Sequence, residues 1–526
     1  MTTEGKSPYL YKILIFFTAF FLVSGTFSSC STNIQKSNHL VASRPKLTTL
    51  PSSTSTSSTL PNSPFHQASW VIKENSLSGT QNWELTGPST GISGYSNSVS
   101  AQVGTNVSLY VSTVASSFQV FAYRMGWYQG NRGRLIWQSG IINGVNQPTC
   151  PLINTTNTIE CNWTPSLSVA ITPTFIQGDY LFKLVSNLNQ QSWIPLTIED
   201  PSDLSAYLIQ NSVTTWQAYN LYGGYDLYSG LKNGVRSYNF RSLAVSFDRP
   251  YQWPTPQVSE FVANELPLVA LAEKLGLDVS YTTNVDLSEN PSLLMGHKTL
   301  VSLGHDEYWS LAERTAVFNA TQTGMNFLAF GANAIFRHIR FSNTALGNFR
   351  LEICYKTTPD PINAFDPEEA TVNWPEPPFP RPSSQILGDQ YSCNPVNAPM
   401  KITEPKSWIF AGSGFTGVVY LPNVIGSEYD HVVPGPNTPS NVEIIANSPL
   451  ICRGIHDYAD TTWLTTKGNG GVFDSGTSAW VGLLAAPCPS QGQLCPSKVL
   501  VQATTNLFMA TGNGPAGIIH PSIGNY

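Results

Sequence analysis

The triplet His305-Asp306-Glu307 places an imidazole and a carboxylate two residues apart. It follows the apolar run 298–303 and precedes a segment with the pattern of a helix start. Because a strand-to-helix loop can direct both side chains at one point, the triplet suits metal binding or acid–base catalysis. The structural alternative is that the helix dipole favours the acidic residues and that His305 hydrogen-bonds a neighbouring carbonyl.

Tyrosines are concentrated in two further segments. Segment 216–228 contains Tyr219 and three further tyrosines around a flexible Gly-Gly turn, and Tyr251 follows Asp248-Arg-Pro. Without other information, the first segment suits packing or sugar stacking, and the second suits a strand end with a surface ion pair. The cysteines and histidines show no zinc-type spacing.

A succession of elements should position these residues. The pattern predicts helix 265–274, strands 277–281 and 298–303, a helix ending at Gly324, and strand 326–330. This alternation predicts a mostly parallel α/β sheet in a C-terminal domain spanning 201–526. Ligands bind at the carboxyl ends of such strands, where His305, Glu307 and Asn333 would lie.

An all-β domain is expected before this α/β domain. Short alternating segments recur over 66–200, for example at 107–112, 118–123 and 179–185, which indicates an antiparallel β-sandwich. A Pro-rich stretch over 358–395 is either a covering loop or a disordered insertion.

Bulk composition narrows the function classes. The chain has 526 residues, so two or more domains are expected. Charged residues make up 11%, with 40 glycines and 38 prolines, which is typical of loop-rich β or α/β proteins. The net charge of −6 comes without a Lys/Arg-dense stretch, so nucleic acid is not an expected partner.

The N-terminus has the pattern of an export signal. Two lysines precede the apolar run 13–23, and Phe27-Ser-Ser-Cys30 resembles a loose bacterial lipobox. We expect a signal peptide over 1–30, lipidation of Cys30 and a Ser/Thr/Pro-rich tether over 31–65. The chain would then meet the membrane only through its lipid anchor, at the bacterial cell envelope. A plain cleaved signal peptide is the alternative, and a eukaryotic host would make four asparagines glycosylation acceptors: Asn106, Asn154, Asn162 and Asn319.

The remaining cysteines predict disulfides. Cys150 with Cys161 and Cys488 with Cys495 have short spacings typical of local pairs in an oxidising compartment. Cys354 with Cys393 is a third candidate pair, which leaves Cys452 as a buried thiol.

Several ordered motifs together carry a family resemblance. Residues from about 205 to 520 resemble the C-terminal domain of the N,N-dimethylformamidase large-subunit family. The motifs are Gln217-Ala-Tyr-Asn220, Asp248-Arg-Pro-Tyr251, Gly304-His-Asp-Glu307, Gly331-Ala-Asn333, Val424-Ile-Gly-Ser-Glu428 and Gly470 to Trp480. Tyr123-Arg-Met-Gly-Trp-Tyr128 resembles the sandwich that commonly precedes this domain.

The resemblance implies a glutamine-amidotransferase-like fold with a mononuclear ferric iron held by two tyrosines and a glutamate. Carried over by motif, these are Tyr219, Tyr251 and Glu307, with His305 as a catalytic neighbour and Asn333 and Arg249 as supporting or substrate-contacting residues. Tyr222, Tyr225 and Tyr228 stay as substitutes for the tyrosine ligands. The fold would suggest a cysteine nucleophile, but the expected turn has no thiol, and the chain has no G-x-S-x-G elbow.

The function implied is hydrolysis of a C–N bond in a small amide by metal-activated water, with His305 moving the proton. Dimethylformamidase works with a small partner subunit inside the cell, whereas this chain carries an export signal and a tether, so its substrate and its partner subunit stay open. A homo-oligomer is also open. Two other classes are a non-catalytic surface protein that binds a glycan or envelope polymer, and a structural protein of the envelope.

Overall fold

The computed structural model describes residues 65–252, 260–488 and 494–526. The predicted signal peptide, Cys30 and all of the predicted tether except Phe65 lie outside the described residues. Within the described part, no helix is long and apolar enough to span a membrane.

The N-terminal strands form two sheets that share one apolar core. One has the order β1 (Ile92–Ser96), β3 (Asn106–Thr113) and β9 (Leu167–Ala170). The other contains β2 (Ser100–Gln102), β11 (Gln191–Glu199), β10 (Gly178–Ser186), β4 (Ser117–Met125), β5 (Gly133–Gln138) and β6 (Ile142–Asn143). Side chains from both sheets, such as Val107, Val120 and Phe182, pack in one cluster. The predicted segments 107–112, 118–123 and 179–185 lie within β3, β4 and β10.

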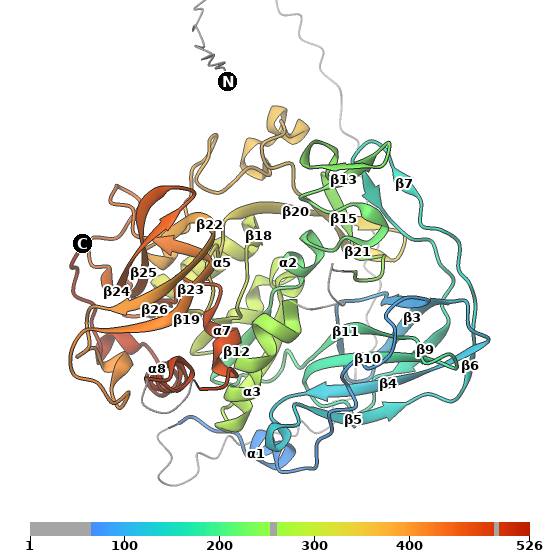
Figure 1. Cartoon of the computed structure of the whole chain (residues 1–526), viewed down its shortest axis with the longest axis horizontal. Helices are drawn as coiled ribbons and strands as arrows, with labels where there is room; N and C mark the ends of the chain where they lie inside the picture. The colour runs from blue at the N-terminus through green and yellow to red at the C-terminus, as the bar shows by residue number, and fades with distance from the viewer. Residues whose placement is uncertain (1–64, 253–259, 489–493) are drawn as a thin grey trace, which may run out of the picture. The chain divides into compact units, whose positions relative to one another are not determined.

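The C-terminal part is organised around a nine-stranded sheet. Its order is β16 (Val279–Thr283), β12 (Tyr207–Asn211), β17 (Thr299–Ser302), β19 (Asn326–Ala329), β26 (Gly471–Asp474), β25 (Ile455–Thr465), β24 (Glu443–Cys452), β22 (Gln390–Ile402) and β23 (Val419–His431). The first five strands are parallel, and the remaining pairings are antiparallel. Figure 1 shows the antiparallel strands in orange at the left, next to β26 and β19.

The parallel half follows from local sequence. Its strands are short, and every residue in β16, β17 and β19 is buried, including polar residues such as Ser280 and Thr282 of β16. The helices α4 (Asn284–Glu289) and α5 (Leu311–Gln322) begin at capping boxes formed by Thr283 with Asp286 and Ser310 with Glu313. With α3 (Leu266–Lys274), these elements match the predicted succession between residues 265 and 330 to within two residues.

The prediction of a mostly parallel, glutamine-amidotransferase-like α/β domain is wrong. Among the described residues there are 26 strands and eight α-helices, and the large sheet is mixed. The error came from extending one strand–helix succession to the whole domain. After residue 389 the chain forms long antiparallel strands, and a turn at Arg453-Gly454 joins β24 directly to β25 without a crossover helix.

A smaller sheet lies near the centre of the C-terminal part. Its order is β15 (Ala244–Ser246), β21 (Gly347–Ile353), β20 (Arg337–Thr344) and β18 (Tyr308–Ser310). The other elements are α1 (Ser69–Asn75), α2 (Val213–Ala218), α6 (Ser384–Leu387), α7 (Trp480–Leu484), α8 (Pro496–Thr511), β7 (Leu152–Ile153), β8 (Thr158–Ile159), β13 (Gly230–Lys232) and β14 (Val235–Ser237).

The Pro-rich stretch is ordered and packs on the protein body. Trp374 stacks on the ring of His338, with the ring centroids 4.0 Å apart, and Arg314 lies over the Trp374 ring. Because these contacts join the stretch to β20 and α5, the alternative of a disordered insertion does not hold.

The two regions are joined by buried contacts within one compact unit. Arg124 of β4 donates to Glu273 of α3 over 3.0 Å, and both side chains are fully buried. Residues of the sandwich such as Trp193 share an apolar cluster with Trp216 and Leu266.

The described residues form three disulfides. Cys150 pairs with Cys161 and Cys488 with Cys495, as the short spacings predicted. The third prediction is wrong, because Cys393 pairs with Cys452 and Cys354 is a buried free thiol. Antiparallel strands place β22 beside β24, a neighbourhood that spacing alone could not reveal.

Candidate metal and active site

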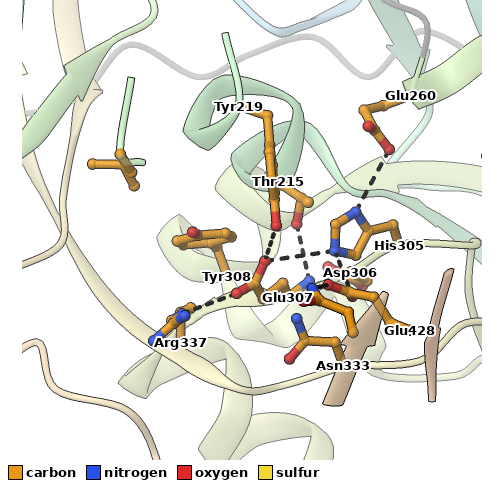
Figure 2. A network of polar contacts seen from close by, with 12 residues as sticks. Thr215, Tyr219, Glu260, His305, Asp306, Glu307, Tyr308, Asn333, Arg337 and Glu428 are labelled. Carbon is orange, nitrogen blue, oxygen red and sulfur yellow. Dashed lines mark hydrogen bonds and ion pairs between the residues drawn. The ribbon is translucent and has the colours of Figure 1, made fainter. Parts of the chain in front are cut away.

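Glu307 lies at the centre of a buried polar network (Figure 2). Its carboxylate accepts hydrogen bonds from the hydroxyls of Tyr219, at 2.8 Å, and Tyr228, at 2.9 Å. Arg337 Nε donates to the same carboxylate over 2.9 Å. The backbone N–H of Glu307 donates to Thr215 Oγ1 over 3.0 Å, which fixes the loop after β17 against α2. One carboxylate therefore gathers two phenols and a guanidinium.

Several short elements supply these side chains. Tyr219 caps the C-terminus of α2, and Tyr228 follows the Gly223-Gly224 turn, where both glycines have positive φ. The Tyr219 and Tyr228 rings stack with centroids 4.5 Å apart. Tyr308, the first residue of β18, donates its hydroxyl to Tyr228 over 2.7 Å, so the phenols form a chain that ends on Glu307.

His305 is surrounded by carboxylates. Its Nε2 lies 3.5 Å from Glu307 Oε2 and 3.5 Å from Glu428 Oε2, while Nδ1 lies 3.6 Å from Glu260 Oε2. Nε2 is buried and makes no hydrogen bond within the described part of the chain. This atom is therefore placed to hold or release a proton between two acids.

Charge and burial divide the network into ionised and neutral members. Burial opposes ionisation of Glu307, but its contact with His305 and the charge of Arg337 outweigh burial and hold its pKa well below the ordinary value. Burial similarly opposes protonation of His305, yet Glu260 and Glu307 raise its pKa well above the ordinary value. Burial and the negative charge of Glu307 raise the pKa of Tyr219 and Tyr228, so without a cation both keep their hydroxyl protons.

Lys356 is a further buried cation at this site. Its Nζ lies 3.3 Å from the centroid of the Tyr228 ring and donates to the carbonyl of Leu227 over 2.9 Å. Burial lowers the pKa of Lys356 to about 7, with a smaller contribution from Arg337. Lys356 was not among the site residues predicted from the sequence.

Asn333 and Arg249, the two predicted supporting residues, both make buried hydrogen bonds near the network. Asn333, in the loop after β19, donates its backbone N–H to Asp430 over 2.8 Å, and its side-chain oxygen is buried without a partner. Arg249 is fully buried and donates to the carbonyls of Tyr225, at 2.8 Å, and Asn220, at 2.9 Å. Arg249 therefore holds the tyrosine-rich segment from behind.

Tyr251 lies apart from this network. It lines an apolar pocket with Trp216, Phe247 and Phe261, and no hydrogen bond or ring contact joins it to Tyr219 or Glu307 among the described residues. Only Gln252 separates Tyr251 from residues 253–259, which the structure does not describe. Tyr251 as a metal ligand stays a prediction.

The structure adds residues to the site that the sequence did not mark. Tyr308 and Arg337 are neighbours through the pairing of β18 with β20, and Glu428 comes from β23. Glu428 accepts from Asn394 over 2.7 Å at Oε1, while Oε2 is buried without a hydrogen bond and faces His305. Glu428 belongs to one of the matching motifs, which was the only signal for it.

The network opens onto a cleft of about 620 Å³. Its lining includes four residues of the network: Tyr219, Tyr228, His305 and Glu428. The rest of the lining is rich in amide and hydroxyl groups. These groups belong to Asn264, Asn394, Asn397, Asn423, Ser427 and Ser478. A ligand in this cleft would reach the charged network directly.

The donor set fits a hard cation. The hydroxyls of Tyr219 and Tyr228 lie 2.8 Å from each other, and both lie within 2.9 Å of Glu307 Oε2, so three oxygens converge on one small region. Oxygen donors of this kind suit a highly charged metal, which would replace the phenolic protons.

The chain is similar to one protein family over most of its length. The family model described as N,N-dimethylformamidase beta subunit-like, C-terminal, matches residues 119–493. A search of curated proteins found no match. Among solved structures, a Paenibacillus cycloisomaltooligosaccharide glucanotransferase in complex with cycloisomaltoheptaose is 7% identical, with 74% of this chain and 69% of that chain covered and a TM-score of 0.17. A likeness this weak does not indicate a shared fold.

Proposed function

Because the chain belongs to the N,N-dimethylformamidase beta subunit-like, C-terminal family, we propose that it is an iron-dependent hydrolase that cleaves the C–N bond of an amide. The convergence of two phenols on the buried Glu307 carboxylate is the observation that carries this proposal. Ferric iron is the metal proposed, because phenolate and carboxylate are hard anionic ligands.

Three residues would hold the metal. Tyr219 and Glu307 agree with the family resemblance, and the contacts of Tyr228 with Glu307 support it, in place of Tyr251, as the second tyrosine. Bound iron supplies a Lewis acid that polarises the amide carbonyl and lowers the pKa of water. Arg337 keeps Glu307 ionised, and Arg249 fixes the segment that carries Tyr228.

His305 is the proposed proton carrier. Its Nε2 faces both Glu307 and Glu428, so a proton taken up at this atom is stabilised by two carboxylates. The leaving amine of an amide needs a proton as the C–N bond breaks, and Nε2 can donate it. Before this transfer, Glu428 stabilises the imidazolium from the side of the cleft, and the imidazole is neutral once the amine has taken the proton.

The cleft supports an amide substrate larger than dimethylformamide. Its volume of about 620 Å³ lies within the range of sites that enclose drug-sized ligands. Asn397 and Asn423, which are exposed along it, offer both donors and acceptors to a polar substrate. The substrate class proposed is therefore a neutral amide that carries further hydrogen-bonding groups.

We also propose that the protein is exported and that it assembles with other chains. Three disulfides suit an oxidising compartment, which supports export and attachment to the bacterial envelope through Cys30. The matched family is named for a beta subunit, which supports assembly into an amidase of several chains.

Metal content and turnover test the proposal together. Purified protein should contain one iron per chain and show a visible tyrosinate-to-iron absorption band. Amides from formamides to N-acyl amino amides should then be screened for amine release. A fully folded, colourless protein without iron would overturn the proposal. Binding of a glycan without any amide turnover would favour the surface-binding alternative.

A further inference from the structure

A second cluster of buried acids lies next to the candidate active site. Asp474 ends β26, Asp430 lies in β23, and Asp389 directly precedes β22. The three residues are 0%, 1% and 0% exposed. One carboxylate oxygen from each lies within 4.8 Å of the other two.

The hydrogen bonds leave part of this negative charge without a partner. Asp430 accepts from the backbone N–H of Asn333 at 2.8 Å, and Asp474 Oδ1 accepts from that of Gly476 at 2.9 Å. Asp389 Oδ2 accepts from Thr462 Oγ1 at 3.2 Å. Asp389 Oδ1 and Asp474 Oδ2, both fully buried, have no hydrogen-bond donor.

In the described part of the chain these acids have no ion-pair partner, and the charge of His305 offsets that of Asp430 only in part. Among the described residues, no lysine, arginine or histidine forms an ion pair with Asp389, Asp430 or Asp474. Each uncompensated buried carboxylate destabilises a fold by several kcal/mol, and close like charges add to that. The cluster must therefore take up protons or a cation.

The geometry suits a cation. Three oxygens within 4.8 Å of one another lie no more than about 2.8 Å from a common centre, so a small contraction would bring them to the Ca²⁺–oxygen distance of about 2.3–2.6 Å. Ca²⁺ accepts irregular, all-oxygen coordination with bidentate carboxylates, whereas Mg²⁺ needs near-octahedral geometry and keeps several waters. A cluster of three fully buried carboxylates matches the all-oxygen coordination of Ca²⁺ better than the water-rich octahedron of Mg²⁺.

We propose that Asp389, Asp430 and Asp474 bind a structural Ca²⁺ ion, distinct from the catalytic metal proposed at Glu307. Asp430 holds the Asn333 backbone and lies two residues after Glu428, so this ion would fix both sides of the His305 pocket. It would also join β26 of the parallel half to β22 and β23 of the antiparallel half.

Calcium titration of the chelated protein tests the site directly. The full chain would be stripped with a chelator and titrated with CaCl₂ or MgCl₂ alone, with calorimetry and thermal unfolding as readouts. We expect one Ca²⁺ per chain, a Tm higher by several degrees in Ca²⁺, and a much smaller rise in Mg²⁺. A stronger response to Mg²⁺ would overturn the assignment to calcium.

Substitutions in the aspartate cluster show whether a bound cation or shared protons stabilise its carboxylates. Asp389→Asn should weaken Ca²⁺ binding at least ~10-fold and lower the Tm measured in Ca²⁺, because a ligand charge is lost. If protons alone occupy the cluster, the same substitution removes repulsion and raises the Tm with or without Ca²⁺, which would overturn the proposal. Asp474→Asn repeats the test if Asp389→Asn does not fold.

Two controls keep the result specific. Asp278→Asn alters a mostly buried carboxylate that accepts from the Ala206 N–H in another part of the sheet, and Ca²⁺ binding should be unchanged. Glu307→Gln should lose iron but keep the Ca²⁺ response, so failure of the catalytic proposal would leave this one standing.

Discussion

The two buried acid clusters of this protein solve the same electrostatic problem differently. Glu307 is fully buried, yet two phenols, Arg337 and His305 stabilise its charge from within the chain. The cluster of Asp389, Asp430 and Asp474 is equally buried and has only neutral hydrogen-bond donors. In the proposed function the first cluster would exchange phenolic protons for a metal, while the second needs an outside cation or a proton for stability. Substitutions in the two clusters should therefore have different effects on metal binding and on stability.

The largest effect should come from Glu307→Gln. The substitution removes the anionic ligand while keeping its shape, so iron affinity should fall more than ~100-fold, beyond the loss typical of outer partners of a metal ligand. Amide turnover should fall with it. Metal analysis and the visible band measure the change, and circular dichroism checks the fold. Retention of stoichiometric iron would contradict the proposed ligand set.

Arg337→Gln should destabilise the metal-free protein. The substitution leaves the Glu307 carboxylate buried without its ion-pair partner, and breaking such a pair costs about 3 kcal/mol. This loss is at the lower end of the range of about 3–5 kcal/mol for a broken buried pair, because the Arg337 side chain is 17% exposed. Urea unfolding of the chelated protein measures the loss. A stability unchanged from the wild type would mean that the phenols and His305 stabilise Glu307 without Arg337.

Tyr228→Phe compared with Tyr251→Phe decides between the two tyrosines. The contacts with Glu307 predict that Tyr228→Phe weakens iron binding by ~10- to 100-fold and shifts the visible band. Tyr251→Phe should leave iron content unchanged, because its hydroxyl makes no contact with Glu307 in the described structure. The reverse outcome would return Tyr251 to the ligand set that the family resemblance implies.

The stability of chelated protein should depend on pH through the aspartate cluster. Burial raises the pKa of Asp474 from 3.8 to about 7 in the folded state. The folded protein therefore holds a proton that the unfolded chain releases, so this stabilisation is complete below pH 3.8 and is lost as the pH rises through about 7. Asp474→Asn should flatten this slope in chemical unfolding measured across pH 4 to 8. Saturating Ca²⁺ should flatten it as well, since a bound cation keeps the carboxylate ionised.

The smallest effect should come from an exposed acid. Glu368→Gln removes a pair with Arg381 in which the glutamate side chain is 51% exposed, so unfolding free energy should change by less than ~1 kcal/mol. Iron and Ca²⁺ binding should both be unaffected. A large loss here would mean that exposure is not what separates these acids from the two buried clusters.

Local sequence determined a large share of what was predicted. The capping boxes before α4 and α5, the short apolar strands of the parallel half and the alternating strands of the sandwich all result from interactions between near neighbours. Glu307 and His305 could be selected for the same reason, because a strand-to-helix loop is visible in the chain around them. The short disulfides depended only on spacing.

Tertiary structure decided the rest. Tyr228, Tyr308 and Arg337 approach Glu307 through the Gly223-Gly224 turn and the pairing of β18 with β20, neither of which leaves a periodic signal in the sequence. The antiparallel half of the sheet, the Cys393–Cys452 pair and the cluster of Asp389, Asp430 and Asp474 join residues tens of positions apart. Long-range pairing of this kind depends on which strands become neighbours, and spacing and local propensity cannot specify that.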